Sequence, residues 1–192
     1  MIPRTYVCHA CRHESLVRSW VHEPRLCPQT NCGGTQSPVP QVYLLHQIIS
    51  GGQTGADRAA LETARALGIP TGGTAPKYWL TETGNDPSLK DFGLVECEVM
   101  GYAVRTDRNV QHADGTVWFG TTDSSGYYCT RTAWRACKKP ALENPTATAL
   151  RKWIITASIY VLNVAGNRAS VTPGIGEIVR DTLVEALCQD NL

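Results

Sequence analysis

The feature that most constrains the fold of this chain is an apolar run, a glycine-rich turn and an amphipathic segment in direct succession. Residues 41–49, QVYLLHQII, are apolar and rich in branched side chains, which favours a buried strand. SGGQTG follows as a turn, and residues 57–67 then carry small and aliphatic side chains at helical spacing, with Gly68 placed to end the helix. Strand, glycine loop and helix in this order predict the opening of a parallel α/β sheet.

Two later apolar runs are also followed by polar loops. TVWFG, residues 116–120, leads into TTDSSG, and IYVLNVAG, residues 159–166, leads into NRAS. A helix is expected over residues 127–139, and another after an N-cap at Thr172 with Pro173 at its first position. The apolar stripe of that last helix is expected to be Ile175, Ile178, Val179, Leu183, Ala186 and Leu187.

The segment between the first helix and the second apolar run is harder to interpret. Residues 70–93 are rich in Gly, Pro and Thr and are expected to be mostly loop. Residues 94–100 fit either a short strand or a helix, because their pattern does not decide between the two.

The three polar loops, SGGQTGAD, GTTDSSG and AGNRAS, are expected to gather at one edge of the sheet, where parallel α/β folds bind ligands. In the first loop, Gly51, Gly52 and Gly55 let the backbone approach a ligand closely. The amides that open the next helix are expected to be unpaired and partly positive, which suits a phosphate or another oxyanion. The loop matches neither G-x-G-x-x-G nor the Walker pattern, so it indicates neither a standard dinucleotide enzyme nor an NTPase.

Several side chains near these loops have two interpretations. Asp57 either caps the first helix or binds a ribose or pterin donor group. Arg168 and Lys77 either neutralise a phosphate or are simply solvated. Aromatic side chains near the second loop either stack on a flat ring or pack in the core; they are Trp118, Tyr127 and Tyr128.

Four cysteines lie close to the start of the chain, in the pattern C-x2-C-x15-C-x4-C; they are Cys8, Cys11, Cys27 and Cys32. Two close pairs at this separation predict one structural zinc ion held by four thiolates, although the second pair is wider than the usual two-residue gap. The alternatives are a ribbon that has lost its metal or a mispaired disulfide, and reserve ligands are His9, His13 and His22. The later cysteines, Cys129 near the second loop among them, are expected to be small buried apolar residues.

Composition excludes several classes of protein. The 192-residue chain has 18 Lys+Arg against 17 Asp+Glu, a net charge of +1, so a basic stripe for nucleic acid is not expected. With 42% apolar and 18% charged residues, it can bury a core. No membrane-length apolar run and no signal-peptide-like start occurs, so we expect a cytoplasmic protein with reduced cysteines.

The chain is expected to contain two domains. GGTQSPVP, residues 33–40, has the composition of a linker. We therefore expect a zinc-ribbon-like segment over residues 1–36 and an α/β domain with a Rossmann-like, doubly wound parallel sheet over residues 37–192.

At this point the sequence resembles a known family, the putative molybdenum-cofactor carrier proteins of the SLOG superfamily. The resemblance begins with IISGGQTGADRAALETARALGIPTGGTAPK, residues 48–77, and continues through TETG, YAVRTDRNVQHADGTVWF and VLNVAGNRASVTPGI. It covers about residues 46–190 and implies a Rossmann-like fold of the SLOG type that usually self-associates as a homodimer or higher homo-oligomer. The loop TTDSSGYYCT departs from the family, which usually has a glycine pair there.

The resemblance also implies a set of ligand-binding residues, to which Ser125 and Gly126 of the second polar loop are added. The set is Gly51, Gly52, Gln53, Thr54, Gly55, Asp57, Gly72, Gly73, Lys77, Arg105, Asn109, Asp114, Ser125, Gly126, Asn163, Gly166 and Arg168. The implied ligand is a small phosphorylated molecule, either molybdenum cofactor or a nucleotide-derived signal such as an ADP-ribose derivative or a cyclic nucleotide.

Binding is expected in preference to catalysis. Related phosphoribohydrolases use a glutamate on the helix after the second loop, and here no Asp or Glu occurs from Ser124 to Leu142. An N-glycosidic hydrolase stays open as an alternative, because Asp57, Asp114 or Asp123 could supply a carboxylate. A weaker idea is that the cysteine-rich segment contacts a protein or a nucleic acid.

Overall fold

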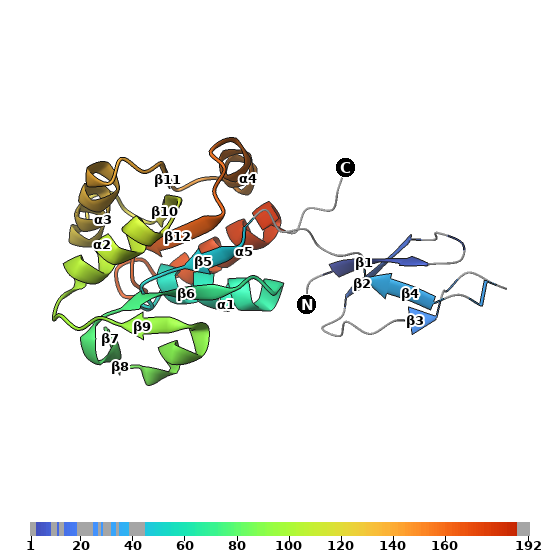
Figure 1. The fold of residues 1–192 in the computed structure, drawn as a ribbon, viewed down its shortest axis with the longest axis horizontal. Coiled ribbons are helices and arrows are strands. Elements are labelled where there is room, and N and C mark those ends of the chain that lie inside the picture. Colours follow the sequence, from blue (N-terminus) through green and yellow to red (C-terminus); the bar gives the residue numbers. More distant parts are fainter. Residues whose placement is uncertain are drawn as a thin grey trace. The chain divides into compact units, whose positions relative to one another are not determined.

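The structure is a computed structural model of the chain. It describes residues 3–8, 11, 14–18, 25–26, 28, 32–33, 35–38 and 45–187. The chain divides into two compact units between residues 42 and 43 (Figure 1), and each unit has its own sheet. None of the helices in the described part of the chain is long and apolar enough to cross a bilayer.

The N-terminal unit contains a four-stranded antiparallel sheet with the order β2-β1-β4-β3. Its strands are β1 (Pro3–Cys8), β2 (Glu14–Arg18), β3 (Arg25–Leu26) and β4 (Thr35–Pro38). The expected linker over residues 33–40 is therefore wrong for β4, which pairs with both β1 and β3. Its Thr, Ser and Pro have a loop-like composition, but backbone pairing with two neighbours determines the structure.

The second unit is built on a six-stranded parallel sheet with the order β11-β10-β12-β5-β6-β9 (Figure 1). The strands are β5 (Gln47–Ile49), β6 (Thr71–Ala75), β9 (Leu94–Glu96), β10 (Gly115–Phe119), β11 (Ala141–Glu143) and β12 (Val161–Gly166). The helices are α1 (Ala56–Leu67), α2 (Tyr102–His112), α3 (Ser125–Ala136), α4 (Ala147–Thr156) and α5 (Ile175–Leu187). This is the expected Rossmann-like α/β fold.

The direction of the crossovers assigns the helices to two faces. The connections through α1 and α4 run one way across the sheet, whereas those through α2 and α3 run the other way. Because parallel crossovers are right-handed, the two directions place their helices on opposite faces. The packing agrees, since α5 contacts α1 and α4 while α2 contacts α3.

Short elements lie between β6 and β9. They are η1 (Lys77–Trp79), the hairpin of β7 (Leu80–Thr81) with β8 (Gly84–Asn85), and η2 (Pro87–Phe92). Beneath them lies an apolar cluster of Leu61, Ala75, Trp79, Leu89, Phe92 and Leu94. The open choice over residues 94–100 is decided in favour of a strand, because β9 pairs with β6.

The expectation that residues 70–93 are mostly loop is wrong for β6, which lies inside the sheet between β5 and β9. Two of its five residues are glycines, which disfavour strands by propensity. Here they are needed sterically: a Cβ on Gly72 would lie 2.6 Å from Gln47 Nε2, and one on Gly73 would overlap the Ser50 carbonyl. The glycines therefore allow β6 to lie close against β5.

The last helix begins two residues later than the sequence predicts. Gly174 has a φ of 82°, which is incompatible with helix, so Thr172 and Pro173 belong to a turn before Ile175. The expected stripe on α5 is buried except for Ile178, which is 54% exposed. The first helix agrees closely with prediction, and Gly68 ends it at a φ of 75°.

Candidate functional site

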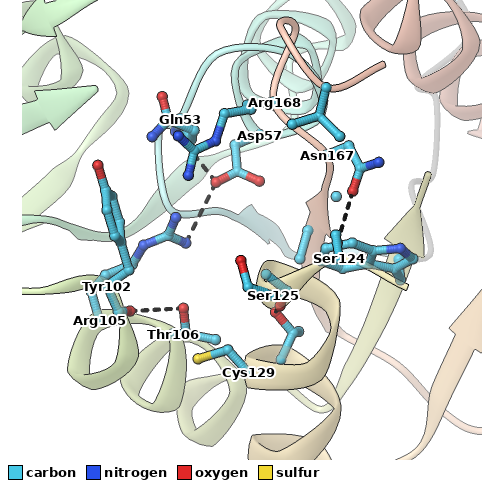
Figure 2. A pocket seen from close by; sticks show the side chains of 16 residues that line it. Gln53, Asp57, Tyr102, Arg105, Thr106, Ser124, Ser125, Cys129, Asn167 and Arg168 are labelled. Carbon is cyan, nitrogen blue, oxygen red and sulfur yellow. Dashed lines mark hydrogen bonds and ion pairs between the residues drawn. The ribbon is translucent and has the colours of Figure 1, made fainter. Parts of the chain in front are cut away.

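A cavity of about 530 Å³ lies at the carboxyl ends of β5, β10 and β12 (Figure 2). The chain leaves β5 through α1 in one direction and leaves β10 through α3 in the other, so the cavity occupies the switch point of the sheet. Its lining consists of Gln53, Asp57, Tyr102, Arg105, Thr106, Trp118, Ser124, Ser125, Gly126, Cys129, Thr130, Ala165, Gly166, Asn167, Arg168 and Val171. Figure 2 shows Asp57, Arg105 and Ser125, from three different helices, pointing toward the same space.

The glycine loop before α1 uses its amides inside the protein. The amide of Gln53 donates to Asp57 Oδ2 at 3.3 Å, and that of Thr54 to Gln53 Oε1 at 3.0 Å. The amide of Ala56 donates to the Asn167 carbonyl at 3.1 Å. The expectation of unpaired amides at this helix end is therefore wrong for these three, because the loop after β12 and the side chain of Asp57 satisfy them.

The glycines of this loop make room for other parts of the protein. A Cβ on Gly51 would overlap the guanidinium of Arg105, and one on Gly55 would lie 2.6 Å from the Asn167 carbonyl. Gly52, at a φ of 75°, faces the side chains of Leu89 and Leu94 in the core. We conclude that the loop is a close-packed platform beside the cavity.

An ion pair joins this platform to α2. Arg105 Nη1 lies 3.5 Å from Asp57 Oδ2, and the two side chains are 12% and 3% exposed. Burial raises the pKa of the Asp57 carboxyl above its ordinary value, while Arg105 and the amide of Gln53 act in the opposite direction. The Nε of Arg105 is buried without a hydrogen-bond partner among the described residues, so this guanidinium has donor capacity left.

The open helix end at the cavity belongs to α3. Its N-cap, Ser124, accepts a hydrogen bond from the amide of Tyr127 at 3.2 Å and donates one to Asn167 Oδ1 at 3.3 Å. The next two amides, those of Ser125 and Gly126, have no acceptor within residues 45–187. Both residues line the cavity, so the free amides and the positive end of the α3 dipole meet there.

Two further donors come from the loops after β5 and β12. Gln53 is 6% exposed; its Oε1 accepts from the amides of Thr54 and Glu82, and its Nε2 is buried without a partner in the described structure. Arg168 is half-buried at the mouth, 5.8 Å from the ring of Tyr102, and Arg105 lies at the same distance from that ring. Cationic and amide donors therefore predominate in the cavity.

Glu82, in the hairpin of β7 and β8, connects the two loops at the rim. It accepts hydrogen bonds from the hydroxyls of Thr54 and Ser170 and from the Ser170 amide at 3.3 Å. Burial raises the pKa of Glu82, but these hydrogen bonds and the charge of Arg168 outweigh it and bring the pKa below its ordinary value. Glu82 is thus a charged bridge between the glycine loop and the loop after β12.

The structure brings together part of the expected ligand-binding set. Seven of its members line the cavity: Gln53, Asp57, Arg105, Ser125, Gly126, Gly166 and Arg168. Gly51, Gly52, Thr54 and Gly55 lie behind it in the platform. Their side chains or α-carbons contact the protein itself.

The remaining expected residues lie elsewhere. Asn109 holds the backbone of Thr74, at 2.7 Å from its amide and 3.1 Å from its carbonyl, and Asn163 donates to Thr116 Oγ1 at 3.2 Å. Asp114 accepts from the amides of Tyr160 and Val161 at the opposite edge of the sheet. Lys77 lies 5.4 Å from the ring of Tyr78, and a separate hollow of about 660 Å³ is lined in part by Gly72 and Gly73.

Sequence reasoning missed most of the α2 and α3 wall. Tyr102 and Thr106 were not predicted to line a site because helix α2 itself was not predicted. Asn167 was missed although it follows β12 directly, and this position at a strand end was the available signal.

The expected zinc ligands fall largely outside what the structure describes. Cys27 and the side chain of Cys8 are not among the described residues, whereas Cys11 is exposed and Cys32 is half-buried. Within the described residues, no group of three or more His, Cys, Asp or Glu side chains could hold a metal ion.

A doubly wound parallel sheet with a donor-rich cavity at its switch point defines a Rossmann-like ligand-binding domain. Residues 48–187 match the circularly permutated YpsA SLOG family, and the chain belongs to this family. The four-stranded N-terminal sheet lies outside the matched residues.

A solved structure supports the same relationship. The crystal structure titled "Putative molybdenum carrier protein", from Syntrophus aciditrophicus SB, is 37% identical with a TM-score of 0.71. The similarity covers 76% of the present chain and 96% of that protein. The search of curated proteins finds no match.

Proposed function

We propose that the Rossmann-like unit binds a small phosphate-bearing molecule of the nucleotide-derived or pterin class in the cavity and holds it without converting it. The observation that carries this proposal is the convergence of donors that lack an acceptor within the described protein. They are the amides of Ser125 and Gly126, the Nε of Arg105 and the Nε2 of Gln53. An oxyanion would accept hydrogen bonds from all of these groups.

The charge of the cavity favours an anion as the bound group. Two arginines line it against the single carboxyl of Asp57, whose pKa is raised. The dipole of α3 adds about 0.3–1 kcal/mol for a negative charge at its end. This proposal moves the expected phosphate from the amides of the α1 loop to those of α3.

The size and the aromatic rim favour a ligand with a flat ring in addition to its anion. A volume of about 530 Å³ suits a drug-sized molecule. Tyr102 is 37% exposed at the mouth, between Arg105 and Arg168, where a heterocycle would stack. Trp118, by contrast, is buried in the wall and donates its indole N–H to the Thr121 carbonyl.

Holding a ligand can serve transport, sensing or sequestration. The name of the related crystal structure supports a carrier of molybdenum cofactor, whereas the SLOG family assignment also supports a sensor or sponge of a nucleotide signal. Mass spectrometry of ligand released from natively purified protein distinguishes a pterin from a nucleotide.

Binding is tested by calorimetric titration of the full chain with pyrophosphate, ADP-ribose and a pterin phosphate. We expect Arg168→Gln to weaken the tightest of these by tenfold or more, since a charge-assisted hydrogen bond contributes about 1.5–3 kcal/mol. Arg180→Gln is the matched control, because Arg180 is exposed on α5 and pairs with Asp181. No binding of any probe, or equal loss in both variants, would contradict the proposal.

Hydrolysis of an N-glycosidic bond is the second candidate, and Asp57 is the observation that favours it. A carboxyl with a raised pKa in a cavity is the group that such a reaction needs. The position after Leu142 offers less, because Glu143 accepts a hydrogen bond from the Tyr127 hydroxyl at 2.6 Å. Incubation with nucleoside monophosphates and ADP-ribose decides: release of free base that stops in Asp57→Asn would replace holding by hydrolysis.

A further inference from the structure

The cysteine-rich start of the chain has no part in the cavity and lies outside the family match. We propose that Cys8, Cys11, Cys27 and Cys32 bind one zinc ion at one end of the four-stranded sheet. The spacing of the cysteines suggests this metal, and the pairing register of the strands supplies an independent reason for it.

The register places both cysteine pairs at the same end of the sheet. Val7 pairs with Glu14, so the connection from β1 to β2 lies beyond Cys8 and contains Cys11. Cys8 also pairs with Gln36 at the start of β4, which fixes that start at the Cys8 end of β1.

The second pair reaches this end through β3. Leu26, at the end of β3, pairs with Thr35, at the start of β4. The connection between them, residues 27–34, begins at Cys27 and contains Cys32. The connections from β1 to β2 and from β3 to β4 therefore leave the sheet on the same side.

The separation of the two connections suits one shared ion. β1 and β3 are both neighbours of β4, so they are two strand spacings apart, or roughly ten ångströms. The connections extend beyond the strand ends and can close this gap, whereas pairs at opposite ends of the sheet could not share an ion. Four thiolates around one zinc ion complete a tetrahedron and leave no position for substrate, so the site is structural.

The size of the unit gives this site a role in folding. A unit of about forty residues buries too little apolar surface to fold securely without a metal, a disulfide or a partner. Zinc binding would therefore couple to formation of the sheet, and a chelator would unfold it.

Zinc content of the full chain tests the proposal directly. Elemental analysis of protein purified under reducing conditions should give about one zinc per chain, and Cys8→Ser and Cys32→Ser should each bring this toward zero. Cys137→Ser is the matched control, because Cys137 is half-buried on the Rossmann-like unit, and it should keep the parent's zinc. Equal zinc in parent and both variants, or none in the parent, would overturn the site.

A second measurement keeps the test decisive if the serine variants fail to fold. Chelation of the parent should remove amide-exchange protection from β1 and β4, and added zinc should restore it, while protection in β10 and β12 persists. An intact mass lower by two hydrogens per cysteine pair under non-reducing conditions, with no bound metal, would show disulfides instead.

Discussion

Asp57 and Arg105 form a buried ion pair that stabilises neither partner fully. The Nε of Arg105 lacks an acceptor in the described structure, and burial disfavours the charged form of Asp57. A ligand phosphate would give Arg105 a second anion and draw it from the carboxyl. The two residues therefore hold the cavity in a state that is ready to exchange one acid for another.

The pH dependence of stability should report the Asp57 carboxyl. Because its folded pKa lies above the ordinary 3.8, the folded state binds more protons than the unfolded state above that pH, and stability falls as pH rises through this window. The free energy of unfolding of the parent, relative to Asp57→Asn, should decrease from pH 3.8 upward until the folded pKa is passed. Urea unfolding at several pH values measures this, and parallel curves for the two proteins would contradict it.

Gly51→Ala should separate binding from folding. Its new Cβ would meet only the mobile guanidinium of Arg105, which would swing away and lose Asp57. We expect weaker binding of the anionic probes with a small change in unfolding free energy. Gly176→Ala, which meets only an ordinary contact with Ala59 on α5's packing face, should change neither; an unchanged affinity in Gly51→Ala would refute the steric argument.

At the scale of elements, the sequence predicts those parts whose pattern repeats. α1, β10 and β12 carry continuous apolar patterns and were placed within two residues of their observed bounds. α2 was missed because only Thr106, Asn109 and Val110 of its eleven residues are buried, and two of these are polar. β6 was missed because its glycines hide a strand that close packing requires.

The same difference explains the outcome for the site. Loops at strand ends could be assigned to one edge of the sheet, which brought Gln53, Asp57 and Arg168 together. The sequence could not reveal which amides have acceptors, since Ala56 and Ser125 differ only in what the loop after β12 offers them. That is why the open helix end was expected at α1 and is found at α3.

The close approach of β6 to β5 can be tested by substitution. Gly73→Ala would put a methyl group on the Ser50 carbonyl at a φ of 125°, whereas Gly84→Ala has a similar φ of 114° and open space. Both should lose about 1–3 kcal/mol from backbone strain. Gly73→Ala should lose clearly more from the clash, as measured by urea unfolding, and equal losses would show that β6 and β5 can move apart.

At the scale of the whole molecule, the two compact units should act independently in binding. Cys8→Ser is expected to lower the zinc content without changing the affinity of the cavity for its anionic probe, because no cavity residue lies before Gln53. Calorimetry on this variant checks it, and a loss of affinity comparable to that of Arg168→Gln would show coupling between the units. The expected self-association into a homo-oligomer stays a prediction for light scattering.

The position of β12 has a consequence for how the chain is made. This strand lies between β10 and β5, yet residues 161–166 are translated late. A nascent chain that ends before them has two half-sheets with no strand to join them, and their facing edges are unpaired. Completion of the sheet must therefore wait for the last sixth of the polypeptide to leave the ribosome, and only then can the protein retain a guest.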